Sequence, residues 1–407
     1  MKFTKSIKQI ITLYSATILS LVSGIAISIF TTRFLGAEGY GDFKFFQLVF
    51  SLVFTILSFG FFNSISRLLA HSDSSDETKS LIGTYGVFVL FIGLFAILIV
   101  FIISFFQGQL FSNNLNLVFR YGSVFVIFFI LNNSFAQILQ GSNNIGLLSI
   151  QKIAPPVLFL ICLIFVNKLN VKEAIIFFYG AMGLASLAVF YKLKPRFENI
   201  SSVVKLVFKE NKTFGRKVYF GSISNVGSGY LGGLLIGYYM DNSIVGFFTL
   251  SVTICTPLLM IPSIVGTTYF KKFASAIEID RRILYLTMGI SVISYIMFYF
   301  LIEKVVYIFY PSAFGEIINY SRLIALGSIF HGFGDLYNRF LYAKGNGNLI
   351  RNGAFVVGVF NVLGYFILIK FYAINGAIFT KVVSGGLYLF FMYYGYVKHI
   401  KRNKIIS

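Results

Sequence analysis

Long apolar stretches dominate this chain of 407 residues and limit what it can fold into. A helix of about 20 apolar residues is needed to cross the roughly 30 Å of hydrocarbon in a bilayer. The strands of a membrane barrel would be shorter and would alternate in polarity. We therefore predict an all-α, polytopic membrane protein with about twelve transmembrane helices, near residues 10–31, 43–65, 81–106, 117–139, 148–166, 173–191, 217–240, 243–269, 283–302, 319–342, 349–370 and 375–397.

The second half of the chain repeats features of the first half. Three pairs of short segments are similar, and the members of each pair lie about half the chain apart. Self-similarity at a nearly constant offset indicates internal duplication. Two six-helix repeats that start on the same side of the membrane are parallel. The pairs are Tyr40–Phe43 with Val245–Phe248, Gln140–Gly146 with Ala343–Gly347, and Asn170–Ile175 with Ala373–Ile378.

The basic residues predict how the chain lies in the membrane. If the N-terminus is cytoplasmic, 24 of the 34 Lys and Arg residues fall on the cytoplasmic side, which is a strong positive-inside bias. Both termini are then cytoplasmic, and a basic linker at about 192–217 joins an N-terminal lobe, residues 1–200, to a C-terminal lobe, residues 201–407. Residues 201–210 suit an amphipathic helix on the membrane surface. The net charge of +20 indicates contact with lipid headgroups, not nucleic-acid binding.

The sequence offers little for enzyme chemistry. It contains no large soluble domain and no phosphate-binding Gly-rich loop. The histidines His71, His331 and His399 are scattered, and Cys162 and Cys255 each lie deep in a predicted span. No spacing typical of a metal site, a cofactor or a disulfide is present. We expect a protein that is not an enzyme and needs no cofactor and no metal.

Charged residues inside a predicted span are the best candidates for a functional site. His331, Asp335 and Arg339 follow one another at four-residue spacing and so share one helix face. A charge within a span is costly unless it faces a cavity or a partner. Two interpretations stay open. In the first, these three residues line a cavity, where they contact sugar or relay an ion. In the second, Asp335 pairs with Arg339 to stabilise helix packing, and Arg339 extends to the membrane interface.

Three further cations and several amides are weaker candidates. Lys152 and Lys381 lie in the fifth and twelfth predicted spans, and each either lines a cavity or extends to an interface. Arg33 ends the first span, where its guanidinium suits phosphate but would equally suit an interfacial anchor. Amides within spans, such as Asn132, are expected to bond between helices or to sugar hydroxyls.

Three segments resemble motifs of one transporter family. Thr31–Gly41 resembles the signature that closes the first helix of oligosaccharide flippases, the Wzx-type polysaccharide exporters of the multidrug/oligosaccharidyl-lipid/polysaccharide exporter superfamily. Asp241–Phe248 resembles the matching motif between helices seven and eight. Phe371–Thr380 resembles the motif that opens the last helix, with Ala373 in place of its first glycine. The resemblance covers the whole chain.

The resemblance implies a MATE-like flippase fold in the bacterial cytoplasmic (inner) membrane. It implies a cargo of undecaprenyl-pyrophosphate-linked sugar repeat units, moved by alternating access for O-antigen or capsule synthesis. It also implies coupling to H⁺ or Na⁺, contact with membrane lipids, and a role for Arg33 in handling the pyrophosphate.

Two alternatives remain. A multidrug or small-cation exporter of the same fold would need carboxylates deep in the N-terminal lobe. The sequence places none there, because Glu38, Asp42 and Glu173 all lie at the ends of predicted spans. A cationic cavity instead favours anionic cargo. An integral-membrane polysaccharide polymerase or glycosyltransferase would need a large outer loop or an acidic catalytic motif, and the sequence has neither.

Overall fold

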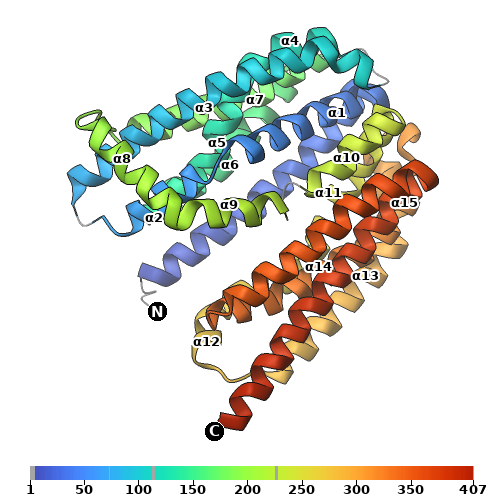
Figure 1. Ribbon diagram of the computed structural model, residues 1–407. Coiled ribbons are helices and arrows are strands. Elements are labelled where there is room, and N and C mark those ends of the chain that lie inside the picture. The colour runs from blue at the N-terminus through green and yellow to red at the C-terminus, as the bar shows by residue number, and fades with distance from the viewer. Residues whose placement is uncertain (1–4, 73, 112–114, 225–227, 407) are drawn as a thin grey trace. The chain divides into compact units, whose positions relative to one another are not determined.

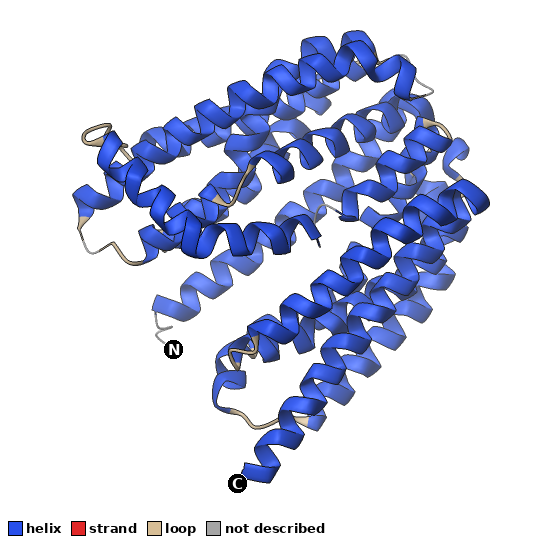
Figure 2. Cartoon of the chain, in the orientation of Figure 1, coloured by secondary structure: helices blue, strands red, loops and turns tan. Residues whose placement is uncertain are grey.

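The computed structural model describes residues 5–72, 74–111, 115–224 and 228–406, which are almost entirely helical and contain no strand (Figure 2). The chain divides into two compact units, residues 1–223 and residues 224–407. This division lies within the seventh predicted span, later than the expected division at residue 200. The contacts of the linker with the first unit, described below, account for the difference.

The first unit contains the six expected spans (Figure 1). Helix α1 bends at Gly36 (φ 67°, ψ −172°) and so supplies the first two spans. Only glycine adopts such a conformation readily. The elements are α1 (Lys5–Leu57), α2 (Phe61–Ala70), α3 (Ser75–Leu110), α4 (Asn116–Gly122), the 3₁₀ turn η1 (Ser123–Phe125), α5 (Val126–Gly141), α6 (Ile145–Phe165) and α7 (Val171–Lys192).

The second predicted span, 43–65, is not one continuous helix. The chain turns at Phe59 and Gly60, which both have positive φ, and continues as α2. Gly60 is also a point of close approach, because a Cβ added there would lie 2.3 Å from the carbonyl oxygen of Gly215. A larger residue would therefore push the linker away from α2.

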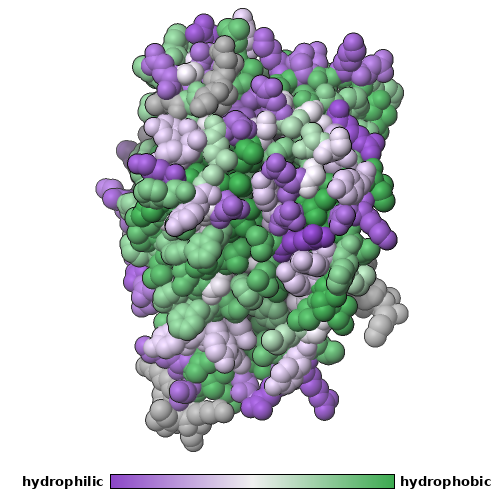
Figure 3. Space-filling view, turned by 90° about the vertical axis from the view of Figure 1, so that its right-hand side faces the viewer, coloured by the Kyte–Doolittle hydropathy of each residue, from purple (hydrophilic) through white to green (hydrophobic). Residues whose placement is uncertain are grey.

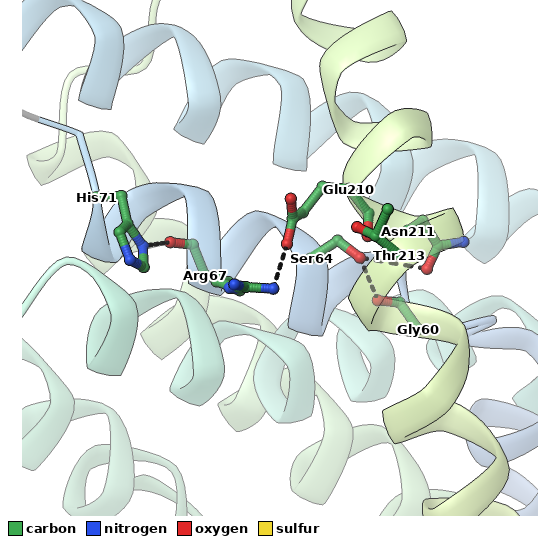
Figure 4. A network of polar contacts seen from close by, with 7 residues as sticks. All are labelled: Gly60, Ser64, Arg67, His71, Glu210, Asn211 and Thr213. Atoms are coloured by element: carbon green, nitrogen blue, oxygen red, sulfur yellow. Dashed lines mark hydrogen bonds and ion pairs between the residues drawn. The ribbon is translucent and has the colours of Figure 1, made fainter.

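The linker is helical and attached to the first unit. It comprises α8 (Ile200–Glu210), the π-helical turn η2 (Asn211–Gly215) and α9 (Arg216–Ser222). Figure 4 shows its contact with α2, where Arg67 pairs with Glu210 at 2.9 Å and the Ser64 hydroxyl lies 3.2 Å from Oδ1 of Asn211. These bonds hold the end of α8 and the start of η2 against α2, so the compact first unit includes the linker.

The second unit contains the eighth to twelfth spans and, in α10, part of the seventh. Helix α15 bends at Ala373 (φ 51°, ψ −135°) and supplies the last two. The seventh predicted span, 217–240, covers α9 of the first unit and α10, and residues 225–227 between them lie outside the described part. The elements are α10 (Ser228–Tyr239), α11 (Asn242–Thr268), α12 (Phe270–Ser275), α13 (Arg281–Phe309), the 3₁₀ turn η4 (Ser312–Phe314), α14 (Ile317–Ala343) and α15 (Gly347–Ile406).

Helix α14 packs closely against both α11 and α15. A Cβ added to Gly332 would lie 2.4 Å from the carbonyl oxygen of Leu259 on α11, and one added to Gly385 on α15 would lie 2.3 Å from that of Gly327. Small residues that allow helix backbones to approach are typical of packing in membranes. The polar residues of α14 are thereby held at fixed places beside two other helices.

Matching turns occur in the two units. After α5 and after α14 the chain passes through one left-handed residue, Asn143 (φ 51°) and Gly345 (φ 72°) respectively. In both turns this residue donates to the carbonyl three residues back and the next residue donates to the carbonyl five residues back, over 2.9–3.1 Å. This is the Schellman ending of a helix. The turns lie in one of the segment pairs that the sequence predicts to be repeated.

The described helices carry the surface of a membrane protein. Eight of them are long and apolar enough to cross a bilayer, and two of these, α1 and α15, bend to supply two spans each. The less apolar α14 and the α9–α10 pair complete the expected twelve. Many large apolar side chains are exposed, such as Phe91 at 78% and Phe165 at 82%, and hydrophobic residues cover broad areas of the face in Figure 3. The all-α, twelve-helix fold expected from the sequence is confirmed.

Candidate functional site

A carboxylate bonded to two partners lies well inside α14. Asp335 accepts a hydrogen bond from the Ser263 hydroxyl of α11 and one from Nε of Arg339 at 3.2 Å. It precedes the last residue of α14 by eight residues, or about 12 Å along the axis. The side chains of Asp335 and Arg339 are 22% and 37% exposed. The ion pair is therefore neither sealed in the helix interface nor fully on the surface.

Tyr388 of α15 gathers a second group of polar side chains against α14. The ring of His331 stacks on the Tyr388 ring with centroids 4.6 Å apart, and Nδ2 of Asn338 donates to the Tyr388 hydroxyl at 2.9 Å. Gly334 makes room for this ring, since an added Cβ would lie 2.4 Å from its Cδ1. The contacts of Tyr388 with His331 and Asn338 place it beside the turn of α14 that carries Asp335. The tyrosine thus joins the two groups.

Lys381 belongs to the same region. It precedes Tyr388 by seven residues on α15, so the two lie on one helix face. Its side chain is half-buried, and its backbone carbonyl lies against α14 one turn before His331, 3.2 Å from a Cβ added to Gly327. We call His331, Asp335, Arg339 and Lys381, with Ser263 and Tyr388, the α14 cluster. Four of the six predicted site residues are therefore brought together in the second unit.

The α14 cluster carries more positive than negative charge. Arg339 and Lys381 outnumber Asp335 even when His331 is neutral. A guanidinium offers five N–H donors, and the pair with Asp335 uses the one on Nε. Such a group recognises phosphate with two parallel hydrogen bonds, while hydroxyl, amide and imidazole groups suit sugars. Among the described residues, no group of three or more His, Cys, Asp and Glu side chains is placed to hold a metal ion.

The other two predicted site residues belong to the first unit. Arg33 is exposed on α1, three residues before the bend at Gly36. Lys152 on α6 is half-buried, and its Nζ lies 3.3 Å from the Thr17 hydroxyl of α1. Lys152 therefore makes a contact between two helices. The role of Arg33 stays a prediction.

Several amides of the first unit bond between helices. Nε2 of Gln151 donates to the Ser186 hydroxyl at 2.6 Å, and Nδ2 of Asn132 lies 3.3 Å from the same oxygen. Three helices, α5, α6 and α7, meet at this serine. The bond of Asn132 agrees with the interhelical interpretation of the span amides.

Sequence reasoning missed one cation and two partner residues. Lys44 of α1 is half-buried, with Nζ 3.2 Å from Gln47 Oε1 and 5.4 Å from the Tyr40 ring centre. The spacing of Tyr40, Lys44 and Gln47 along one helix face was an available signal. Ser263 and Tyr388 gave no such signal, because their contacts depend on tertiary packing.

Comparison with known proteins identifies what this chain resembles. Residues 6–270 match the family model described as polysaccharide biosynthesis protein. A protein of Shigella flexneri named "Putative O-antigen transporter" is 24% identical over 274 residues, which are 60% of this chain and 61% of that protein. The chain therefore spans about three fifths of the length of this relative.

Two solved structures share the fold. Lipid II flippase MurJ in an inward closed conformation superposes with a TM-score of 0.74 and 14% identity, over 96% of this chain and 89% of that chain. An inward-facing multidrug resistance MATE family transporter of the MOP superfamily superposes with a TM-score of 0.72 and 14% identity, over 98% and 99%. At this identity the likeness shows the fold alone, which is the flippase fold of that superfamily.

Proposed function

We propose that this chain, which belongs to the polysaccharide biosynthesis protein family, carries undecaprenyl-pyrophosphate-linked sugar repeat units across the bacterial cytoplasmic membrane. The family, the named relative and the fold make it an integral-membrane transporter and not an enzyme. The lipid-linked cargo, the membrane and the coupling ion belong to the proposal.

The observation that carries the proposal is the α14 cluster. A charged side chain in the middle of a span costs roughly 2.5–3.5 kcal/mol on insertion scales. Asp335 and Arg339 pair with each other, yet both side chains keep part of their surface exposed. We infer that this surface faces water and not lipid. A water-filled path lined by Arg339 and Lys381 suits an anionic pyrophosphate.

The mechanism we propose is alternating access by the two units. The pyrophosphate and sugar occupy the aqueous path, and the polyprenyl tail stays in the lipid. Asp335 is the candidate for ion coupling, because a carboxylate that gains H⁺ or Na⁺ weakens its pair with Arg339 and frees the guanidinium for phosphate. Both termini and the linker are expected in the cytoplasm from the positive-inside bias.

Variants at the ion pair test this proposal. Asp335→Asn should reduce surface polysaccharide strongly at normal membrane abundance, and the swapped variant D335R/R339D should stay inactive, because cargo and ion need each charge at its own position. The matched control is the Glu303–Arg322 pair at 3.3 Å, which joins α13 to α14 and has an exposed carboxylate. The swap E303R/R322E should keep export near the wild-type level.

Recovery of full export by D335R/R339D would reduce the pair to a packing contact.

A second measurement distinguishes a water-filled cavity from a sealed helix interface. A cysteine in place of Asp335 should react with a small hydrophilic thiol reagent and should be protected by cargo. An unreactive cysteine in an active transporter would contradict the aqueous path.

A further inference from the structure

An apolar cavity lies between α3 and α8 in the first unit, far in sequence from the α14 cluster. Its volume is about 750 Å³, within the roughly 300–1,000 Å³ typical of ligand pockets. One wall is α3 from Val87 to Leu98, and the other includes Val204 and Phe208 of α8. We call it the α3–α8 groove. The groove is not accounted for by the proposed transport of sugar and pyrophosphate.

The dimensions of the groove match an acyl chain. Val87 and Leu98 are eleven residues apart on α3, which is about 16 Å along the axis and about half of the roughly 30 Å hydrocarbon thickness. The groove thus has the depth of one leaflet. Its wall residues Phe91, Leu94 and Leu98 are 78%, 63% and 52% exposed, so they present a continuous apolar surface to an occupant.

The groove is lined by aromatic rings where it meets α8. Phe208 contacts Phe61 with ring centroids 5.0 Å apart and Phe88 with centroids 6.1 Å apart. Phe61 and Phe88 also contact each other, with centroids 4.8 Å apart. These rings form one wall beside α8, and the groove extends from them along α3 toward Leu98.

Helix α8 places positive charge beside this apolar wall. Val204 and Phe208 form an apolar row four residues apart, and Lys205 and Lys209 form a parallel, exposed row one residue further on. Between 192 and 217 the chain carries eight basic residues and two acidic ones. One of the two, Glu210, is already paired with Arg67 (Figure 4). The mouth of the groove therefore attracts an anionic headgroup.

We propose that the α3–α8 groove binds one acyl chain of an anionic phospholipid whose headgroup pairs with Lys205 and Lys209. An amphipathic helix at the interface binds by apolar burial together with attraction to anionic lipid, and this groove combines both. An undecaprenyl chain is several times longer than one leaflet is deep, so the groove fits a phospholipid better. The bound lipid joins α8 to α3 and stabilises the linker on the first unit.

The absence of tryptophan from the sequence allows a direct test. Phe91→Trp places the protein's one indole in the groove wall, and lipids with brominated acyl chains quench it on contact. The variant is reconstituted in phosphatidylcholine vesicles with brominated phosphatidylglycerol or brominated phosphatidylcholine. Each lysine near a headgroup contributes about fivefold at low salt, so we expect about 25-fold preference for phosphatidylglycerol, lost in F91W/K205Q/K209Q.

Matched controls separate a site from general lipid contact. The preference should persist in F91W/K398Q/K401Q, which removes two exposed lysines of α15. A tryptophan at Ile293, 60% exposed on α13, should show little preference. Leu94→Trp replaces Phe91→Trp if the latter does not fold.

Three results would overturn the proposal. Equal quenching by the two brominated lipids, or a preference that survives K205Q/K209Q, would remove the headgroup site. Relief of quenching by undecaprenyl phosphate at a lower mole fraction than unbrominated phosphatidylglycerol would assign the groove to the polyprenyl carrier instead.

Discussion

Replacing Gly332 with alanine tests the helix contact that holds Asp335 against Ser263. The added Cβ would lie 2.4 Å from the carbonyl oxygen of Leu259 and 3.1 Å from Cδ of Pro262. A carbon and a carbonyl oxygen normally stay about 3.3 Å apart or more, so α14 and α11 must separate by about 1 Å. Overpacking of this kind costs about 1–3 kcal/mol, which exceeds the gain of about 1 kcal/mol from replacing a helical glycine with alanine.

The assay is thermal unfolding of the purified protein in detergent. For Gly332→Ala we expect a Tm about 2–4 °C below that of the wild type. A cost of about 2 kcal/mol less a gain of about 1 kcal/mol leaves about 1 kcal/mol, which shifts the Tm of a unit of this size by that amount. Gly289→Ala on α13 is the matched control, because nothing lies within 4 Å of its added Cβ. Its Tm should stay the same or rise. Equal or higher Tm for Gly332→Ala would refute the close contact between α11 and α14.

Three further predictions concern Ser263, Arg33 and the position of the linker. Ser263→Ala should lower export about tenfold or more, because its hydroxyl donates to a carboxylate and such a hydrogen bond contributes about 1.5–3 kcal/mol. The control Thr267→Ala, one turn further along α11 and exposed, should leave export unchanged. Equal export by both variants would contradict a role for Ser263. Arg33→Ala should abolish export at normal membrane abundance and Arg33→Lys should restore part of it, measured as surface polysaccharide, while full activity of the alanine variant would leave Arg33 an interfacial anchor. A cysteine at Ser201, in a chain whose native cysteines are replaced, should resist an impermeant thiol reagent in intact cells; labelling from outside would contradict the cytoplasmic linker.

The membrane spans could be predicted because hydrophobic length is a local property. The bends of α1 and α15 fall within or beside motifs that the sequence singled out, at Gly36 and Ala373. The break at Phe59 and Gly60 could not be predicted, because it accompanies the approach of Gly215 from a segment more than 150 residues away. For the same reason the sequence predicted only a linker between the two lobes. Its packing on α2 depends on residues that are far apart in the chain.

The candidate site was predictable only in part. Helical spacing placed His331, Asp335 and Arg339 on one face, and the structure gives Asp335 and Arg339 a direct ion pair. Their partners Ser263 and Tyr388 come from other helices, and no local pattern in the sequence selects them. Periodicity therefore identified the helix and the charges but not the contacts that hold the charges in place.

The most direct test of the proposed function is translocation by the purified protein in sealed proteoliposomes. Undecaprenyl-pyrophosphate-linked oligosaccharide is incorporated, and an impermeant enzyme added outside reports how much sugar reaches the outer leaflet. We predict that the wild type moves the sugar well above the rate of protein-free vesicles and that Asp335→Asn falls near that background. Wild-type vesicles that show only the background rate, with folded protein and an imposed ion gradient, would contradict the account.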